Sequence, residues 1–525
     1  MEFRYAISLV LEAHLPFVRE FKKDDDLTIL GEEERFFEYI SETLIPLLEV
    51  LYRLDNDHIP FKLAMVISPI LCHMLCDEHL QKKYLSYLDK QIEFGKKEME
   101  RTAAQSDLNK LAQNYCDTIT EKRNAFTEKY EKNLLKTFDF YRRKGKLEIL
   151  ATCATHAFMP FMSHNGESLQ AQMEIPVAVY RKHFAGNPQG FWLPELGWTA
   201  ELEPYLRAYN YSYTIVDTHG LLFGDPAPEK GCFFPVKTPN GTFVIARDHF
   251  AVKEIEKMAA DEIYRNNDHD AGYDLPSENV KPFSGAEGER HRTGYDYYTH
   301  INSVYNLEAA SGKVKEHAKK FIEKTEARLK EASEHIKEAP ISLYAQKCGF
   351  FGCAWHEGPD FIEALFRNAA ENSDLKFVCP GEYIYQQENQ LQVVSPQFSS
   401  SGENGYAETW LDVSNDWIYR HLYQSMDRMT ELAERFPDDT GLKERALNQA
   451  AREILLAQSS DWPSFLYNQD STEFARNQAE NALRNFTTIY EALGSNYIST
   501  EWLTNLEKRH NIFPNINYRV FRRKK

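Results

Sequence analysis

The sequence predicts an α/β fold with a largely parallel sheet closed as a barrel, followed by an all-α C-terminal domain. Two observations predict this arrangement. Up to about residue 400, short runs rich in Ile, Leu, Val and Tyr alternate with longer amphipathic stretches, which is typical of repeated βαβ units. Beyond residue 415 the apolar residues recur only at helical spacing. With 525 residues, 42% of them hydrophobic, the chain is large enough for two domains, which we place at residues 1–400 and 401–525.

The first half of the chain contains most of the predicted strands. These runs are short, apolar and bounded by turn residues, at 3–11, 61–68, 147–151, 190–193 and 213–216. Helical periodicity predicts helices between them, at 32–54, 167–184 and 201–209. The highly charged stretch near 80–143 also has its apolar residues at helical spacing, so we interpret it as long helices inserted into the main domain.

The second half of the chain is less regular at first and then fully helical. Short strand-like pieces at 232–236 and 243–246 are followed by a Gly-, Asp-, Tyr- and His-rich stretch at 268–299, which we expect to be an ordered loop over a site. A helix at 312–339, a strand at 341–345 and a helix at 359–370 complete the barrel. The C-terminal helices are predicted at 415–436, 442–458, 472–493 and 500–510.

Composition excludes several classes of function. Lys plus Arg total 61 and Asp plus Glu total 79, and the net charge of −18 argues against nucleic-acid binding and against docking on an anionic membrane. No apolar run reaches the ~18 residues of a membrane span, and no signal peptide is recognised. The eight cysteines form no dense framework, so we expect free thiols and a cytoplasmic location. The oligomeric state stays open.

The strongest functional signals stand where the predicted strands end. Acidic and imidazole side chains follow four different strands, and the carboxyl ends of parallel strands meet at one end of a barrel. We therefore expect these side chains to converge on one site. Carboxylates with nearby imidazole and indole rings are what a sugar-processing enzyme needs. The residues are Glu12, His14, His156, Glu195, Asp217 and His219.

The order of these motifs resembles that of glycoside hydrolase family 57, and within it the 1,4-α-glucan branching enzyme branch. The segments that carry the resemblance are Leu9–Pro16, Gly145–Glu148 with Ala154-Thr-His156, Gly190-Phe-Trp-Leu-Pro-Glu195, Tyr213–His219, Asn415–His421 and Leu456–Trp462. The resemblance implies a distorted (β/α)7 barrel with a helical insertion near 80–143, plus an all-α C-terminal domain. It also implies a retaining reaction on an α-glucan or oligosaccharide, with no cofactor and no metal.

The resemblance also assigns roles to individual residues. Glu195 takes the position of the nucleophile, which in a retaining enzyme forms a covalent glycosyl intermediate with help from a general acid about 5–5.5 Å away. The residues implied to contact the sugar are His14, His156, Trp192, Asp217, His219, Arg247, Trp355, Asp461 and Trp462.

The chain departs from the family pattern at the general acid. Alignment on Phe351-Gly352 and Trp355 places Lys347 where the family has its acidic Asp. A lysine, with an ordinary pKa near 10.4, is a poor proton donor to a glycosidic oxygen at neutral pH. Glu12, which stands where the family has a His, is the best substitute acid, and Glu357 and Asp360 are weaker candidates.

Other departures affect the family's sugar-facing aromatic positions. Residues 252–260 lack the Trp and glycines of a family loop, and Ser401 stands in place of a family Trp. Three functions therefore stay open: a working glucan enzyme with a recruited acid, a catalytically silent homologue that binds glucan or a partner, and a metal-dependent hydrolase or deacetylase built on His14, His156 and Asp217.

Overall fold

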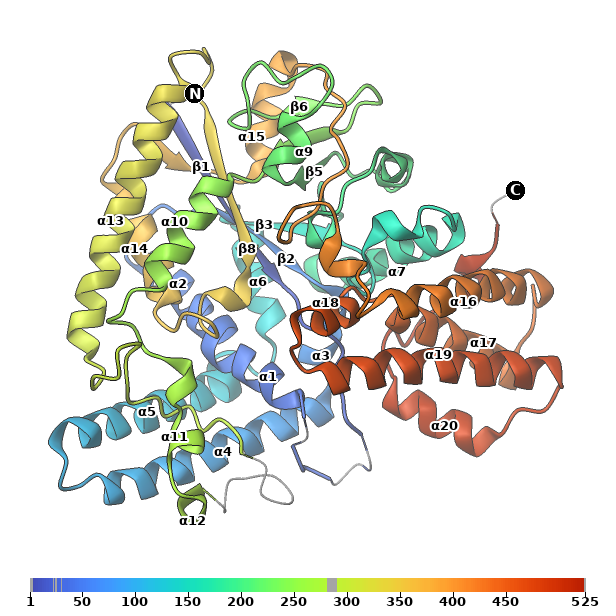
Figure 1. Ribbon diagram of the computed structural model, residues 1–525, viewed down its shortest axis with the longest axis horizontal. Helices are drawn as coiled ribbons and strands as arrows, with labels where there is room; N and C mark the ends of the chain where they lie inside the picture. Colours follow the sequence, from blue (N-terminus) through green and yellow to red (C-terminus); the bar gives the residue numbers. More distant parts are fainter. Residues whose placement is uncertain (1–2, 22, 24–25, 30, 281–289, 524–525) are drawn as a thin grey trace.

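The barrel of the computed structural model is built on parallel strands. The structure describes residues 3–21, 23, 26–29, 31–280 and 290–523 (Figure 1). Within them, seven parallel strands lie in the order β7-β5-β4-β3-β2-β1-β8. Their bounds are β1 (Tyr5–Ala13), β2 (Leu63–Ile67), β3 (Leu147–Thr152), β4 (Gly190–Trp192), β5 (Tyr213–Val216), β7 (Phe243–Ala246) and β8 (Ile341–Lys347). This arrangement confirms the predicted α/β class and the (β/α)7 count.

The barrel is distorted at the gap between β7 and β8. The sheet order ends at these two strands without a ladder between them in the described residues. The backbone N–H of Asp248, just after β7, donates to the carbonyl of Leu343 at 2.7 Å and bridges the gap. Two short strands complete the sheet: β6 (Val236–Lys237) is antiparallel to β7, and β9 (Leu375–Phe377) pairs with the start of β1. All nine residues of β1 are buried, as expected for a parallel strand covered on both faces.

Helices surround the sheet, and a helical hairpin projects from it. The barrel helices are α1 (Glu33–Glu38), α2 (Ile45–Asn56), α3 (Pro69–Leu75), α7 (Gly166–Phe184), α8 (Glu203–Ala208), α9 (Thr218–Leu222), α10 (His249–Ala259), α11 (Ala271–Asp274), α12 (Ser277–Val280), α13 (Leu307–Ala332), α14 (Gly358–Ala370) and α15 (Pro380–Gln387). The insertion consists of α4 (Glu78–Arg101), α5 (Ser106–Asn124) and α6 (Leu134–Arg143), with α4 and α5 side by side at the lower left of Figure 1. The predicted insertion is thereby confirmed.

The C-terminal part is helical, as predicted, and packs around a central helix. Its helices are α16 (Asp416–Arg435), α17 (Gly441–Ala457), α18 (Asp461–Asn468), α19 (Thr472–Gly494) and α20 (Thr500–Arg509). Every residue of α17 from Ala446 to Ala457 is buried except Asn448, because α16, α19 and α20 all pack against it. None of the described helices is long and apolar enough to cross a membrane.

Three local predictions were wrong in extent. Residues 232–235 are not a strand, and only Val236–Lys237 pair with β7. The helix predicted at 312–339 begins earlier, at Leu307, because the Asn306 side chain caps it by accepting from the Ala309 N–H at 3.0 Å. The 268–299 stretch contains short helices, and its described end packs on the insertion, where the Tyr115 hydroxyl donates to the Asp296 carbonyl at 2.6 Å. Residues 281–289 of that stretch lie outside the described residues.

Candidate active site

Glu195 stands on a tight turn directly after β4. Its backbone has φ +57° and ψ +23°, a left-handed conformation that is uncommon for a residue with a side chain and concentrates at functional sites. The turn is held by Ser401, whose backbone N–H donates to the Glu195 carbonyl at 2.7 Å. The Ser401 hydroxyl also donates to Oε2 of the Glu195 carboxylate at 3.2 Å. The turn thus presents a buried, oriented carboxylate at the carboxyl end of the barrel.

Lys347, the last residue of β8, faces this carboxylate. Its Nζ lies 3.4 Å from Glu195 Oε1, and its side chain is 62% exposed whereas that of Glu195 is 6% exposed. The negative charge of Glu195 raises the pKa of Lys347 above its ordinary value. The amine is therefore an ammonium at neutral pH. Lys347, which the sequence predicts to stand at the general-acid position, is thus a cation and not an acid.

Glu12 lies beside Lys347 in the sheet, but its carboxylate accepts hydrogen bonds from two buried side chains. The two residues are paired across the β1–β8 ladder. Oε1 of Glu12 accepts from His156 Nε2 at 2.6 Å and from Trp192 Nε1 at 2.5 Å. Burial alone would raise the pKa of Glu12, but His156, Lys347 and His14 outweigh burial and lower it. Glu12 is therefore held as a carboxylate, and this environment opposes the substitute-acid role suggested by the sequence.

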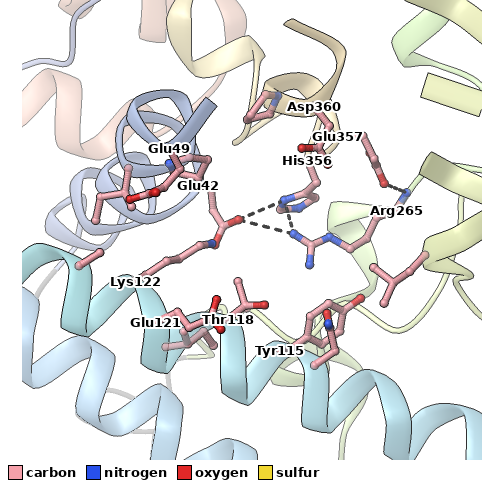
Figure 2. A pocket seen from close by; sticks show the side chains of 18 of the residues that line it. Glu42, Glu49, Tyr115, Thr118, Glu121, Lys122, Arg265, His356, Glu357 and Asp360 are labelled. Atoms are coloured by element: carbon pink, nitrogen blue, oxygen red, sulfur yellow. Dashed lines mark hydrogen bonds and ion pairs between the residues drawn. The ribbon is translucent and has the colours of Figure 1, made fainter. Parts of the chain in front are cut away.

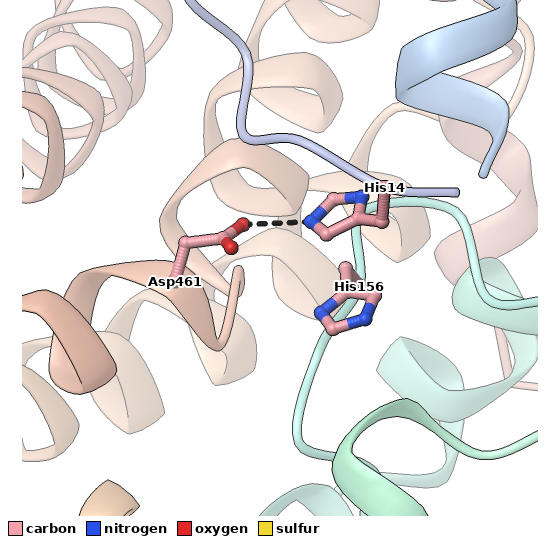
Figure 3. Close-up of side chains that lie close together, drawn as sticks. All are labelled: His14, His156 and Asp461. Atoms are coloured by element: carbon pink, nitrogen blue, oxygen red, sulfur yellow. Dashed lines mark hydrogen bonds and ion pairs between the residues drawn. The ribbon is translucent and has the colours of Figure 1, made fainter. Parts of the chain in front are cut away.

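Two histidines stack to form the floor of the site. The rings of His14 and His156 are parallel within 5°, with centroids 3.8 Å apart. His14 Nε2 donates to Asp461 Oδ2 at 3.0 Å (Figure 3), and its Nδ1 lies 2.9 Å from Ser68 Oγ. His156 has φ +53°, like Glu195, and its Nδ1 lies 2.9 Å from Ser460 Oγ. Strand ends of the barrel and α18 of the C-terminal part thus build the floor together.

The pKa values of the two stacked histidines are shifted in opposite directions. Burial and the neighbouring His156 lower the pKa of His14, against the effect of Asp461. Burial would lower the pKa of His156 too, but its ion pair with Glu12 outweighs burial and raises it. The pKa of Asp461, which burial would raise, is lowered by His14 and His156. These directions favour the charged form of His156 and the neutral form of His14.

The stacked histidines do not fit a metal site. His14, His156 and Asp461 bring possible ligand atoms within 4.8 Å of one another. A metal ion must lie in the plane of each imidazole, on the nitrogen lone pair, at about 2.0–2.1 Å. Parallel rings 3.8 Å apart cannot both meet this condition for one ion. All four ring nitrogens also have hydrogen-bond partners. Asp217, the third member of the metal site considered from sequence, instead pairs with Arg247, whose Nε donates to its Oδ1 at 3.2 Å.

A small pocket opens beside these side chains. Its volume is about 180 Å³, and its wall includes Glu12, His14, Lys347 and Asp461 together with Phe36 from α1. The barrel and the C-terminal helices thus both contribute to it.

Comparison with known proteins decides the family. The model of glycosyl hydrolase family 57 matches residues 8–396, and the model of the 1,4-alpha-glucan branching enzyme C-terminal domain matches residues 421–521. The chain belongs to glycosyl hydrolase family 57. It is 25% identical to the 1,4-alpha-glucan branching enzyme TK1436 of Thermococcus kodakarensis, an alignment that covers 97% of this chain and 77% of that protein.

Solved structures of similar proteins share this fold. The crystal structure of the α-amylase AmyC from Thermotoga maritima is 34% identical, with a TM-score of 0.91, over 99% of this chain and 100% of that one. The branching enzyme of Pyrococcus horikoshii, at 23% identity and a TM-score of 0.88 over 100% of this chain and 98% of that one, shares the fold.

The remaining residues implied by family 57 fall into two groups. His219 lies at the site's edge, where its Nε2 donates to the Gly405 carbonyl at 2.8 Å. Trp462 is buried, and its Nε1 donates to the Leu456 carbonyl at 2.7 Å, which anchors the start of α18 next to Asp461. Trp355, by contrast, is 2% exposed and packs among core rings, with Phe361 at 4.9 Å between centroids. The structure therefore places Trp355 in the core rather than at the pocket.

Several serines that contact the predicted site residues were not themselves predicted to lie in the site. Ser401 supports Glu195, Ser68 and Ser460 each bond one histidine, and the Ser459 hydroxyl donates to Asp461 Oδ2 at 2.5 Å. Single serines carry no sequence signal of their own. Ser459 and Ser460 directly precede Asp461 within a segment that resembles family 57, and this position next to a predicted site residue indicates that they lie in the site.

Proposed function

We propose that this family 57 protein acts on α-1,4-glucan chains as a glycosyl transferase of the branching-enzyme type, with Glu195 as its nucleophile. One observation carries this proposal: the strained turn after β4 holds the Glu195 carboxylate, buried and hydrogen-bonded by Ser401, at the end of the barrel where the histidine floor lies. The C-terminal helical domain matched to branching enzymes, and the names of TK1436 and the Pyrococcus horikoshii enzyme, support the choice of α-glucan.

In the proposed reaction Glu195 attacks the anomeric carbon while the bond to the leaving glucan breaks. The departing oxygen takes a proton from the Lys347 ammonium. A hydroxyl of a second glucan chain then attacks the anomeric carbon, the bond to Glu195 breaks to return the carboxylate, and the hydroxyl proton goes to the Lys347 amine. The Lys347 ammonium lies 3.4 Å from Glu195 and is a weak proton donor for the departing oxygen. We therefore expect slow cleavage of unactivated glucans.

A second candidate function is glucan binding without turnover. The specific observation that favours it is the environment of Glu195: the ammonium of Lys347 lies 3.4 Å from its carboxylate, and the carboxylate of Glu12 is hydrogen-bonded to His156 and Trp192. Of the weaker acid candidates, Glu357 accepts from the Tyr305 hydroxyl at 2.7 Å and lines another pocket with Asp360.

One experiment separates the two functions. Purified protein is incubated with amylose, and reducing ends, iodine colour and new α-1,6 linkages are followed over days, with Glu195→Gln as the matched control. Turnover that Glu195→Gln abolishes supports the transferase. Amylose binding at equal affinity in both proteins, with no turnover in either, supports the binding protein. Absence of binding in both contradicts both functions.

The cellular setting and the domain division are also proposals. All eight cysteines are free in the structure, which supports a reducing, cytoplasmic location. The change from barrel to helices only, between β9 and α16, supports domains at 1–400 and 401–525.

A further inference from the structure

A second, larger pocket lies between the helical insertion and the barrel (Figure 2). Its volume is about 570 Å³, against about 180 Å³ for the pocket beside Lys347, and the two pockets share no lining residue. Its wall comes from five separate parts of the chain: residues 42–53, residues 114–129, Arg265, residues 294–307 and residues 356–360. The pocket is therefore a product of the insertion and not an extension of the active site.

The face that α5 turns toward this pocket is polar. Tyr115, Thr118 and Lys122 follow one another at helical spacing and point into the pocket in Figure 2, with Glu121 on the same side. The apolar residues of α5 that lie outside the pocket wall, such as Leu111 and Ala112, supply the core contacts that a covering helix needs. A helix that only covered the barrel would not require a second, polar stripe turned inward.

The cations of the pocket wall are paired with carboxylates. Lys122 lies 2.9 Å from Glu42, Lys129 lies 2.6 Å from Glu49, and Arg265 lies 3.7 Å from Glu42. These charges compensate one another, so the wall has little net charge to attract a free anion or a metal ion. It still offers strong hydrogen-bond donors and acceptors side by side, which suits a neutral and polar ligand.

One acceptor in this wall has no hydrogen-bond partner. Glu357 is 5% exposed; its Oε1 accepts from the Tyr305 hydroxyl at 2.7 Å, while its Oε2 makes no hydrogen bond. The Arg265 Nε is a buried donor that also makes no hydrogen bond, although it lies 3.7 Å from Asp296 Oδ2 in an ion pair. Buried polar atoms of this kind normally find a partner, because leaving one unpaired costs about 1–3 kcal/mol. A ligand with hydroxyl groups, each both donor and acceptor, can supply partners for such atoms.

We propose that this pocket is a second, non-catalytic binding site for a neutral oligosaccharide. A pyranose chain binds through hydrogen bonds to its hydroxyl groups and contacts with aromatic rings. The wall offers paired charges, the polar stripe of α5, the Glu357 oxygen without a hydrogen bond, and tyrosine rings. That the sugar is an α-glucan rests on the proposed function, whereas the pocket chemistry does not. Such a site would hold one part of a long glucan away from Glu195 while another part enters the cleft.

The test measures maltotriose binding to the full chain by calorimetry and amide hydrogen exchange. We expect two molecules of maltotriose bound per chain, with exchange slowed both in residues 114–124 of α5 and around Glu195. Thr118→Trp fills the pocket and is expected to remove one equivalent and the α5 protection. Thr488→Trp, the same change on the exposed face of α19, is the matched control and should keep both. Glu357→Gln, a conservative change, should weaken the second site at least fivefold.

The outcomes separate this site from the proposed function. Protection around Glu195 without protection in α5, in the unaltered protein, overturns the second site and leaves the proposed function standing. Protection in α5 alone supports the second site and contradicts glucan binding in the cleft. Absence of protection in both regions overturns both. Equal stoichiometry in Thr118→Trp and Thr488→Trp, with both variants folded by thermal unfolding, also overturns the second site.

Discussion

Replacing Lys347 by Asp is expected to increase cleavage of α-1,4-glucans by about 10²–10⁴-fold, the usual contribution of a positioned general acid. Lys347 Nζ lies 3.4 Å from Glu195 Oε1. An Asp carboxylate ends two bonds closer to the backbone, which moves the acidic group back by about 2.5 Å. The resulting separation of about 6 Å approaches the 5–5.5 Å of retaining pairs. Repulsion from Glu195 would also raise the pKa of the new carboxyl, as an acid requires.

The loss of the ion pair does not cancel this gain. At 3.4 Å the attraction between the two charges is about 1 kcal/mol in water and about 5 kcal/mol at an effective dielectric of 20. Because the Lys347 side chain is 62% exposed, the smaller figure applies. About 1 kcal/mol is roughly a fivefold effect, whereas a general acid contributes about 3–5 kcal/mol.

The assay follows reducing ends and α-1,6 linkages formed from amylose. Lys347→Asn, which has the shape of Asp but no acidic proton, is the matched control and should stay at the rate of the unaltered protein or below. The double variant with Glu195→Gln should be inactive. Equal rates for Lys347→Asp and Lys347→Asn would refute the reasoning, as would an unaltered protein that already matches Lys347→Asp.

Three further predictions follow from the same geometry. Unaltered protein should release fluoride from α-maltosyl fluoride, which needs no proton for its leaving group, and Glu195→Gln should not; equal release contradicts Glu195 as nucleophile. Glu12→Gln should cost about 3 kcal/mol in urea unfolding, because it leaves His156 without its carboxylate. The pKa of Glu12 is lowered from 4.5 and that of His156 is raised from 6.5. The ion pair therefore makes its full contribution to the free energy of unfolding between about pH 4.5 and 6.5. This contribution is lost as pH falls through the lowered pKa of Glu12 and as pH rises through the raised pKa of His156. A cost of Glu12→Gln that does not change with pH would contradict the ion pair as its cause. Lys83→Met should cost about 3–5 kcal/mol by thermal and urea unfolding, since Lys83 and Glu33 form a 2.7 Å ion pair at 3% and 0% exposure; a change under 1 kcal/mol contradicts it.

The parallel strands and the insertion were predictable because their signals are local. An apolar run such as 61–68 or the helical spacing of 81–143 lies within a few turns of chain, and burial on both faces of a parallel strand makes the run nearly continuous. The helix start at Leu307 was missed because its cap, Asn306, lies before the periodic residues begin. The Glu195 motif was also predictable from local sequence, because a strand, a turn and an acidic residue follow one another directly.

Sequence by itself determined the fold class and the order of most elements, and it predicts the family positions of Glu195 and Lys347. Only the tertiary structure decided how the acidic groups are used: Glu12 is tied to His156, 144 residues away, and Trp355 is packed in the core. It also decided that Ser401 holds the Glu195 turn across 206 residues. The physical reason is that these contacts depend on strand register and on how the C-terminal helices close over the barrel. Neither leaves a periodic pattern in the sequence, because one hydrogen bond constrains only the two side chains that form it.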